Sequence, residues 1–168
     1  MKMFLLKGKG SMTMTPTQES LSMIMKVLDE EKKEEGEKEG NALVKQFLSE
    51  FREAGGKVHK EGRSGNHYHL EYRAVTIEVS LHGATKMWWS VGVNFINKVE
   101  KWGGHWGVVF LTPDKRFWVD GCNFLGIAGD ETEIGRYHVQ LANLERSPSS
   151  ANRFSSVSEF RLISGLSE

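Results

Sequence analysis

Residues 66–83, NHYHLEYRAVTIEVSLHG, hold the side chains best suited to chemistry. Polar and apolar residues alternate there, and successive side chains of a strand point to opposite faces of a sheet. His67, His69 and Glu71 therefore share one face, and Glu78 belongs to the second polar series of the same segment. Imidazoles combined with carboxylates suit a transition metal, whereas carboxylate-rich sites suit Mg²⁺ or Mn²⁺. The segment is thus a candidate metal site.

Only the Arg-Ala pair at 73–74 separates the two alternating runs, which predicts an antiparallel hairpin with this pair as its turn. On that register His69 lies opposite Glu78 and His67 lies opposite Ser80, so the side chains of each pair can meet. The ordinary alternative is a solvated polar face, because antiparallel sheets often leave one face in water. Both interpretations follow from the same pattern.

The chain has 168 residues, for which we expect a loose tail at 1–14 and a single domain at 15–168. Basic and acidic residues number 22 each, so no overall charge favours nucleic acid or an anionic membrane. The single cysteine, Cys122, excludes an internal disulfide, and no motif supports it as a nucleophile. No apolar run suits a membrane span or a signal peptide, so we expect a cytoplasmic protein without a membrane partner.

The elements that position the hairpin follow from capping residues and periodicity. An apolar helical stripe follows Thr15, while the mixed-charge run 29–39 predicts a break, and Asn41 can cap a second helix. The order of elements predicts an α+β fold, with N-terminal helices packed on a mixed, largely antiparallel sheet of about six strands and a short C-terminal helix. We expect strands at residues 57–60, 67–72, 75–82, 87–95, 106–111, 117–119 and 137–144, a loop at 121–135, and the last helix after Ser156.

The segment 40–121 has an order of elements that resembles a known group of enzymes. A helix ending in Ala-Gly-Gly leads to a strand with the polar residue His69, then to Ile-Glu-Val-Ser at 77–80, and then to aromatic-rich stretches. This order is similar to the core of the PD-(D/E)XK nuclease superfamily, in which a helix precedes a strand with an acidic ligand and a strand with an E-x-K signature. Glu78 stands at the Glu position, whereas His69 replaces the first Asp and Ser80 replaces the Lys.

The resemblance implies cleavage of nucleic-acid phosphodiesters assisted by Mg²⁺ or Mn²⁺, which would activate water and stabilise the charged transition state. Glu78 would then be catalytic and a metal ligand, with His69 or Glu71 as the second ligand. His67 joins the candidate metal ligands because it shares the face of His69. Lys86 would replace the missing lysine as the second catalytic residue and position or deprotonate the water. With two motif positions changed, an inactive relative that only binds is the alternative.

Local basic and aromatic residues are the candidates for contact with nucleic acid. Lys57, Lys60 and Arg63 precede the hairpin and can contact phosphates. Trp88 and Trp89 are adjacent in a predicted strand, so one of them faces the core and the other is exposed or lies under a helix. We take Trp89 as the candidate that stacks on bases.

Two other classes of function stay open. The first is a non-enzymatic binding or regulatory protein, related to phages or defence, that holds its partner on an aromatic sheet face. The second is a metal enzyme acting on a small molecule, with His67 and His69 as an H-x-H pair of ligands on one strand face. A protein partner and the oligomeric state are left open by the sequence.

Overall fold

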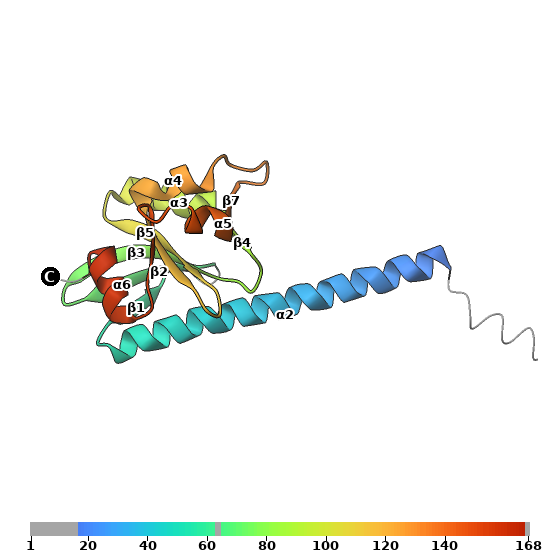
Figure 1. The fold of residues 1–168 in the computed structure, drawn as a ribbon, viewed down its shortest axis with the longest axis horizontal. Helices are drawn as coiled ribbons and strands as arrows, with labels where there is room; N and C mark the ends of the chain where they lie inside the picture. The colour runs from blue at the N-terminus through green and yellow to red at the C-terminus, as the bar shows by residue number, and fades with distance from the viewer. Residues whose placement is uncertain (1–16, 63–64, 167–168) are drawn as a thin grey trace, which may run out of the picture. The chain divides into compact units, whose positions relative to one another are not determined.

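The computed structural model describes residues 17–62 and 65–166 (Figure 1). The predicted tail at 1–14 and the candidate phosphate contact Arg63 lie outside this described part. The chain divides into two compact units, residues 1–35 and 36–168. The described residues of the first unit are helical apart from Thr17, and the sheet and all remaining elements belong to the second.

A single helix, α2 (Gln18–Glu53), replaces the two helices predicted for this region (Figure 1). Thr17 caps its start, because the Ser20 N–H donates to Thr17 Oγ1 at 3.1 Å. The break predicted from glycine was wrong, because Gly40 has a packing role. A Cβ on Gly40 would lie 2.3 Å from the Gly83 carbonyl oxygen. The missing side chain therefore lets the helix and the end of a strand approach closely.

The main sheet has six strands in the order β1-β2-β3-β5-β6-β8. Strands β3 and β5 pair in parallel, and the other neighbours pair antiparallel, which confirms the predicted mixed, largely antiparallel sheet and the α+β class. The crossover between β3 and β5 contains a helix, as parallel neighbours require a long connection. The strands are β1 (Lys57–Lys60), β2 (His67–Tyr72), β3 (Val75–Gly83), β5 (Trp106–Leu111), β6 (Arg116–Asp120) and β8 (Ala151–Arg153).

A second, two-stranded sheet pairs β4 (Trp88–Gly92) with β7 (Arg136–Gln140). Both strands are shorter than predicted, because the chain turns helical directly after each of them. The predicted loop at 121–135 was wrong in its first half, where Asp120 caps a helix through a bond from the Cys122 N–H. The short helices are α3 (Val93–Trp102), α4 (Gly121–Ala128), α5 (Leu141–Glu145) and α6 (Val157–Ser164).

The final helix was predicted from its capping residues, and α6 confirms it. The Ser156 hydroxyl accepts a hydrogen bond from the Glu159 N–H at 3.2 Å. The Glu159 carboxylate in turn accepts from the Ser155 N–H at 2.9 Å, which gives a reciprocal capping arrangement one residue out of the usual register. Gly165 ends the helix with a φ of 80°, a conformation that glycine adopts without steric cost.

Each face of the main sheet packs on its own hydrophobic core. One core joins the sheet to α6 and the C-terminal half of α2 through residues such as Phe47, Phe51 and Phe160. The other core joins the opposite face to α4, α5 and the small sheet, and it includes Phe110 and Phe124. Both faces are therefore covered by other elements (Figure 1).

Candidate functional site

The hairpin β2–β3 has the predicted register. His69 pairs with Glu78 and His67 pairs with Ser80. The turn residues at 73–74 both have left-handed backbone conformations, with φ values of 48° and 67°. Two successive left-handed residues form the type of tight turn whose twist matches two antiparallel strands. The turn and the alternation together place the polar side chains of both strands on one face.

Two imidazoles converge on the carboxylate of Glu78. His67 Nε2 bonds to Oε2, and His69 Nδ1 lies 2.9 Å from Oε1. The three side chains, which we call the His–Glu–His cluster, are 13%, 26% and 11% exposed for His67, His69 and Glu78 respectively. An ionised carboxylate only accepts hydrogen bonds, so the two nitrogens that face it carry hydrogen. His67 Nδ1 and His69 Nε2 are then the nitrogens available for other chemistry.

The cluster lies between a helix and the edge of the sheet. The Phe95 ring of α3 packs edge-on against the His67 ring, with centroids 4.9 Å apart. On the other side the His59 ring of edge strand β1 lies 5.9 Å from the His69 ring. The helix therefore covers His67, while His69 is the more accessible imidazole. The reduced exposure to water strengthens the hydrogen bonds to the carboxylate.

A second polar group, His82 with Ser80 and Asn66, lies further along the same face of β3. The Asn66 amide nitrogen is 3.4 Å from His82 Nδ1, and His82 Nε2 is 2.6 Å from Ser80 Oγ. Burial and, to a smaller degree, the positive charge of Arg136 lower the pKa of His82 to about 4. His82 is therefore neutral near pH 7, with its Nε2–H donating to Ser80. Ser80, which stands at the Lys position of the resembled motif, is bonded to a core histidine.

The metal ligands predicted from the sequence come together only in part. Glu71 pairs with Thr76, the next same-face pair after His69 and Glu78, which places it about 7 Å further along the strands. Within residues 17–62 and 65–166, no group of three or more His, Cys, Asp or Glu side chains is placed to hold a metal ion. In the His–Glu–His cluster the facing donor atoms bond to one another and do not point at a common centre. As arranged, the side chains do not fit the predicted Mg²⁺ or Mn²⁺.

Lys86, the predicted second catalytic residue, does not lie beside Glu78. Glu78 pairs with Trp106 near the start of β5, whereas Gly83 pairs with Leu111 at its end. Five residues of strand separate Glu78 from Gly83, which is roughly 16 Å at the rise of a β-strand. Lys86 follows beyond that end in an exposed turn. The substitution of Lys86 for the motif lysine is therefore not supported by its position.

The candidate base-stacking residue Trp89 is buried. It is 3% exposed, and its ring packs against Phe110 with centroids 5.0 Å apart, so it cannot stack on a base. The strand alternation predicted that one of the two tryptophans is core, and the exposed one is Trp88, at 47%. The candidate phosphate contacts Lys57 and Lys60 are both exposed on β1. Lys57 shares the face of His69, whereas Lys60 pairs with Tyr68 on the opposite face.

Sequence reasoning missed a polar group at the start of β5, on the strand end that pairs with Glu78. His105 Nε2 lies 2.6 Å from Asp120 Oδ2, and Asp120 Oδ1 accepts from the Cys122 N–H at 3.3 Å. Burial alone would raise the pKa of Asp120, but hydrogen bonds from His105 and Cys122 outweigh it and lower this pKa. The hydrogen bond to Asp120 raises the pKa of the Cys122 thiol, which disfavours a thiolate nucleophile. The hairpin predicted for strands β5 and β6 was the sequence signal that could have indicated that His105 and Asp120 lie close together.

No protein-family model matches the chain, and no curated protein is significantly similar to it in sequence. Within the described residues, none of the helices combines the length and the apolar character that crossing a bilayer requires.

Proposed function

We propose that the chain is a nuclease-like protein that cleaves phosphodiesters of RNA, with the His–Glu–His cluster as its reaction centre. The observation that carries this proposal is the convergence of His67 and His69 on the single carboxylate of Glu78. A carboxylate that holds an imidazole fixes its orientation and its tautomer, which is how a histidine is prepared for acid–base catalysis.

The cluster can supply both proton transfers of RNA cleavage. The ribose 2′-hydroxyl is the nucleophile, and one neutral imidazole removes its proton as the oxygen attacks phosphorus. The bond from phosphorus to the 5′-oxygen breaks, and a protonated imidazole gives that oxygen its hydrogen. Glu78 stabilises the imidazolium through the bonds that it accepts from His67 and His69. His69, as the more exposed of the two, is the imidazole that first meets the substrate.

Basic side chains on the neighbouring edge strand support an anionic substrate. Lys57 and His59 lie on the same face as His69, because His59 pairs directly with His69 and Lys57 pairs with Glu71. Lys57, Lys60 and His59 are exposed. Phosphate contacts from such residues position a nucleic acid without reading its bases. We therefore expect the protein to cleave RNA with little preference for its base sequence.

The resemblance to the PD-(D/E)XK nucleases also implies a metal ion, which the acid–base mechanism described above does not use. Two imidazoles and one carboxylate are donor types that suit Mn²⁺ or Zn²⁺ better than Mg²⁺, although as arranged they do not point at a common centre. The hydrogen bonds within the cluster would first have to open, so we derive no catalytic step through a metal.

The test is a cleavage assay on fluorescent RNA and DNA oligonucleotides, first in EDTA and then with Mn²⁺ or Mg²⁺ titrated in. We expect RNA cleavage in EDTA, and Glu78→Gln should lower the rate about 1,000-fold because both imidazoles lose their acceptor charge. Glu100→Gln, on an exposed position of α3, is the matched control and should cleave at the unchanged rate.

Three outcomes separate the candidate functions. Cleavage that appears only with added Mn²⁺ or Mg²⁺ would replace the acid–base mechanism by the metal-assisted one. Binding of the oligonucleotides without turnover, insensitive to metal, would support the non-enzymatic binding protein. Neither cleavage nor binding, together with stoichiometric metal on elemental analysis, would favour the small-molecule metal enzyme.

A further inference from the structure

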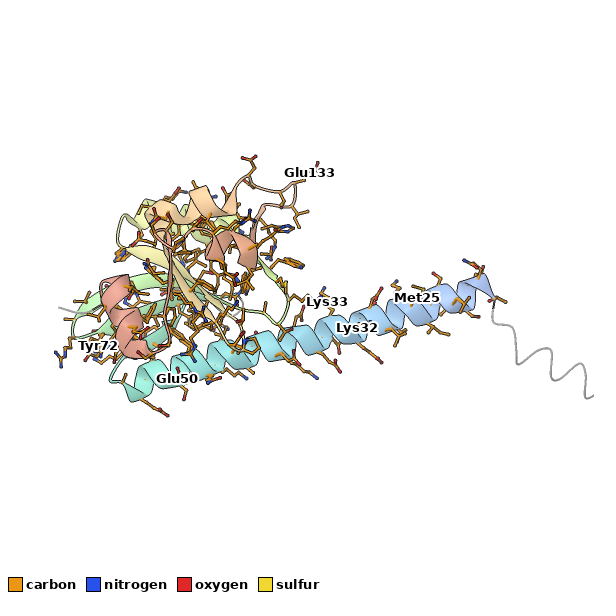
Figure 2. All side chains as sticks on the ribbon, in the orientation of Figure 1. Met25, Lys32, Lys33, Glu50, Tyr72 and Glu133 are labelled. Atoms are coloured by element: carbon orange, nitrogen blue, oxygen red, sulfur yellow. The ribbon has the colours of Figure 1, made fainter. Side chains whose placement is uncertain are left out.

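The first unit of the chain exposes an apolar helix face. Residues 18–30 of α2 carry their large apolar side chains on about half of the helix circumference, at 100° per residue. Met25 is labelled among the side chains of this segment in Figure 2. The exposed fractions run from 44% to 69% for Leu21, Met23, Ile24, Met25, Val27 and Leu28. A contiguous exposed stripe of this kind marks an interaction surface and is not a random scatter of apolar residues.

The polar half of this segment argues for a protein partner. Helices that lie on a membrane carry Lys and Arg on their polar face, which attract anionic lipids. Here the polar half has one basic residue, Lys26, against three acidic residues, Glu19, Asp29 and Glu30. An acidic polar face is repelled by an anionic lipid surface. The apolar half is therefore suited to a second helix.

We propose that this face, residues 18–30, pairs with the same face of a second copy of the chain in an antiparallel helix pair. Six partly exposed side chains of this size can bury roughly 80 Å² each, which is about 500 Å² per helix and 1,000 Å² per pair. That area is at the lower limit for a specific interface, and it matches a weak, reversible dimer. Two-fold pairing uses one patch twice, so a single self-complementary stripe is sufficient.

Charge selects the antiparallel orientation. The run 29–39 contains seven acidic residues and three lysines, a net charge of −4. Parallel pairing would place two such runs side by side, and like charges would repel. With Ile24 opposite Met25 of the second copy, Leu21 lies opposite Leu28. The acidic start of the run, residues 29–31, then lies beside residues 18–20 of the other helix, where the helix dipole favours negative charge and Glu19 is the single acidic side chain.

The test is sedimentation equilibrium on the full chain. We expect a monomer–dimer equilibrium with a Kd of roughly 1–100 µM. The double variant Ile24→Glu/Leu28→Glu should weaken the dimer at least tenfold, while Ser22→Glu/Lys26→Glu on the polar half should change Kd less than twofold. Far-ultraviolet circular dichroism checks that both variants keep their helix. A monomer at all concentrations, or an equal Kd for the apolar-face variant and the wild-type chain, would overturn the proposal.

Disulfide trapping tests the orientation. In a Cys122→Ser background, the variants Leu21→Cys and Leu28→Cys are mixed and oxidised under mild conditions. Antiparallel pairing predicts mainly the mixed disulfide between positions 21 and 28. Preferential formation of the two homodimers would show parallel pairing and reject the proposed arrangement. Neither experiment depends on cleavage, so the outcome is separable from that of the proposed function.

Discussion

Two histidine groups share one face of the same hairpin and differ in what surrounds them. In the His–Glu–His cluster the partner is the carboxylate of Glu78, and His69 keeps 26% of its side chain exposed. At His82 the partners are the hydroxyl of Ser80 and the amide of Asn66, and the residue is 7% exposed. A charged acceptor stabilises an imidazolium, whereas neutral partners and burial exclude it. The same residue type thus faces a charged acceptor at one place and is packed among neutral partners at the other.

Among the variants that compare the two histidine groups, the largest expected effect is that of His69→Gln. His69→Gln should lower the rate of RNA cleavage about 100-fold, because one of the two proton-transfer groups is lost. His82→Gln should leave that rate within twofold at pH 7, because His82 meets no substrate in the proposed mechanism. Single-turnover cleavage of one oligonucleotide by both variants measures the difference. Equal losses in the two variants would show that the hairpin acts through its stability and not through the cluster.

The next effect is the pH dependence of stability at His82. Its folded pKa of about 4 lies below the ordinary value of 6.5, so the unfolded chain binds the proton more readily between these values. The free energy of unfolding should therefore fall as the pH drops below 6.5, by up to about 3 kcal/mol once the pH passes through 4. Urea unfolding at pH 7, 5.5 and 4.5 measures this decrease in the free energy of unfolding.

The control for the His82 effect is His82→Gln, which has no proton to gain. Its loss of stability between pH 7 and 4.5 should be smaller than that of the wild-type chain by most of the amount expected for His82. If both proteins lose stability equally, groups other than His82 cause the acid sensitivity, and the contrast between the two histidine groups weakens.

The smallest effect is expected at an ion pair away from the hairpin. Arg116 makes two bonds to the Glu50 carboxylate, at 3.0 Å through Nη2 and through Nη1 at 2.6 Å. The hydrogen bond from Arg116 lowers the pKa of Glu50, so the pair stabilises the fold near neutral pH and loses this contribution as the pH falls below about 4.5. Because Glu50 is partly exposed, Glu50→Gln should cost only about 0.5 kcal/mol. Urea unfolding at pH 7 measures this cost, and cleavage should be unchanged.

A cost at Glu50 as large as that at His82 would contradict the ranking by burial on which the comparison depends. Glu50 is labelled on α2 in Figure 2, and its neighbour Gln46 donates to the same carboxylate at 3.2 Å. Gln46→Ala is the milder companion variant, since it removes a neutral exposed hydrogen bond and leaves the ion pair intact.

Much of the fold could be predicted from local patterns. The hairpin register follows from alternation and a two-residue turn, and the start of α6 follows from its capping residues. The error at Gly40 comes from a contact with a distant residue, whereas the Asp120 cap of α4 is a local signal that the predicted loop overlooked. Gly40 suits the helix because Gly83 lies against it, and propensity alone scores such a glycine as a break.

The candidate site could be predicted only as a list of residues. Pairing of His69 with Glu78 followed from the register, but the bond from His67 to the same carboxylate did not. Trp89 was the wrong tryptophan, because alternation states that adjacent residues face opposite ways and not which way is inward. Lys86 was wrongly assigned to the site. It is close to Glu78 in sequence, but the residues between them form an extended strand that separates the two.

The sequence by itself determined the class of fold, the hairpin and the set of polar residues on one face, because these depend on interactions between near neighbours in the chain. Only the tertiary structure decided which histidines bond to a carboxylate and which histidine is buried and neutral. That decision depends on α3 covering His67 and on the second core enclosing His82, and both come from residues distant in sequence. Burial changes the cost of a charge more than any local pattern does, so the chemistry of the face follows from packing.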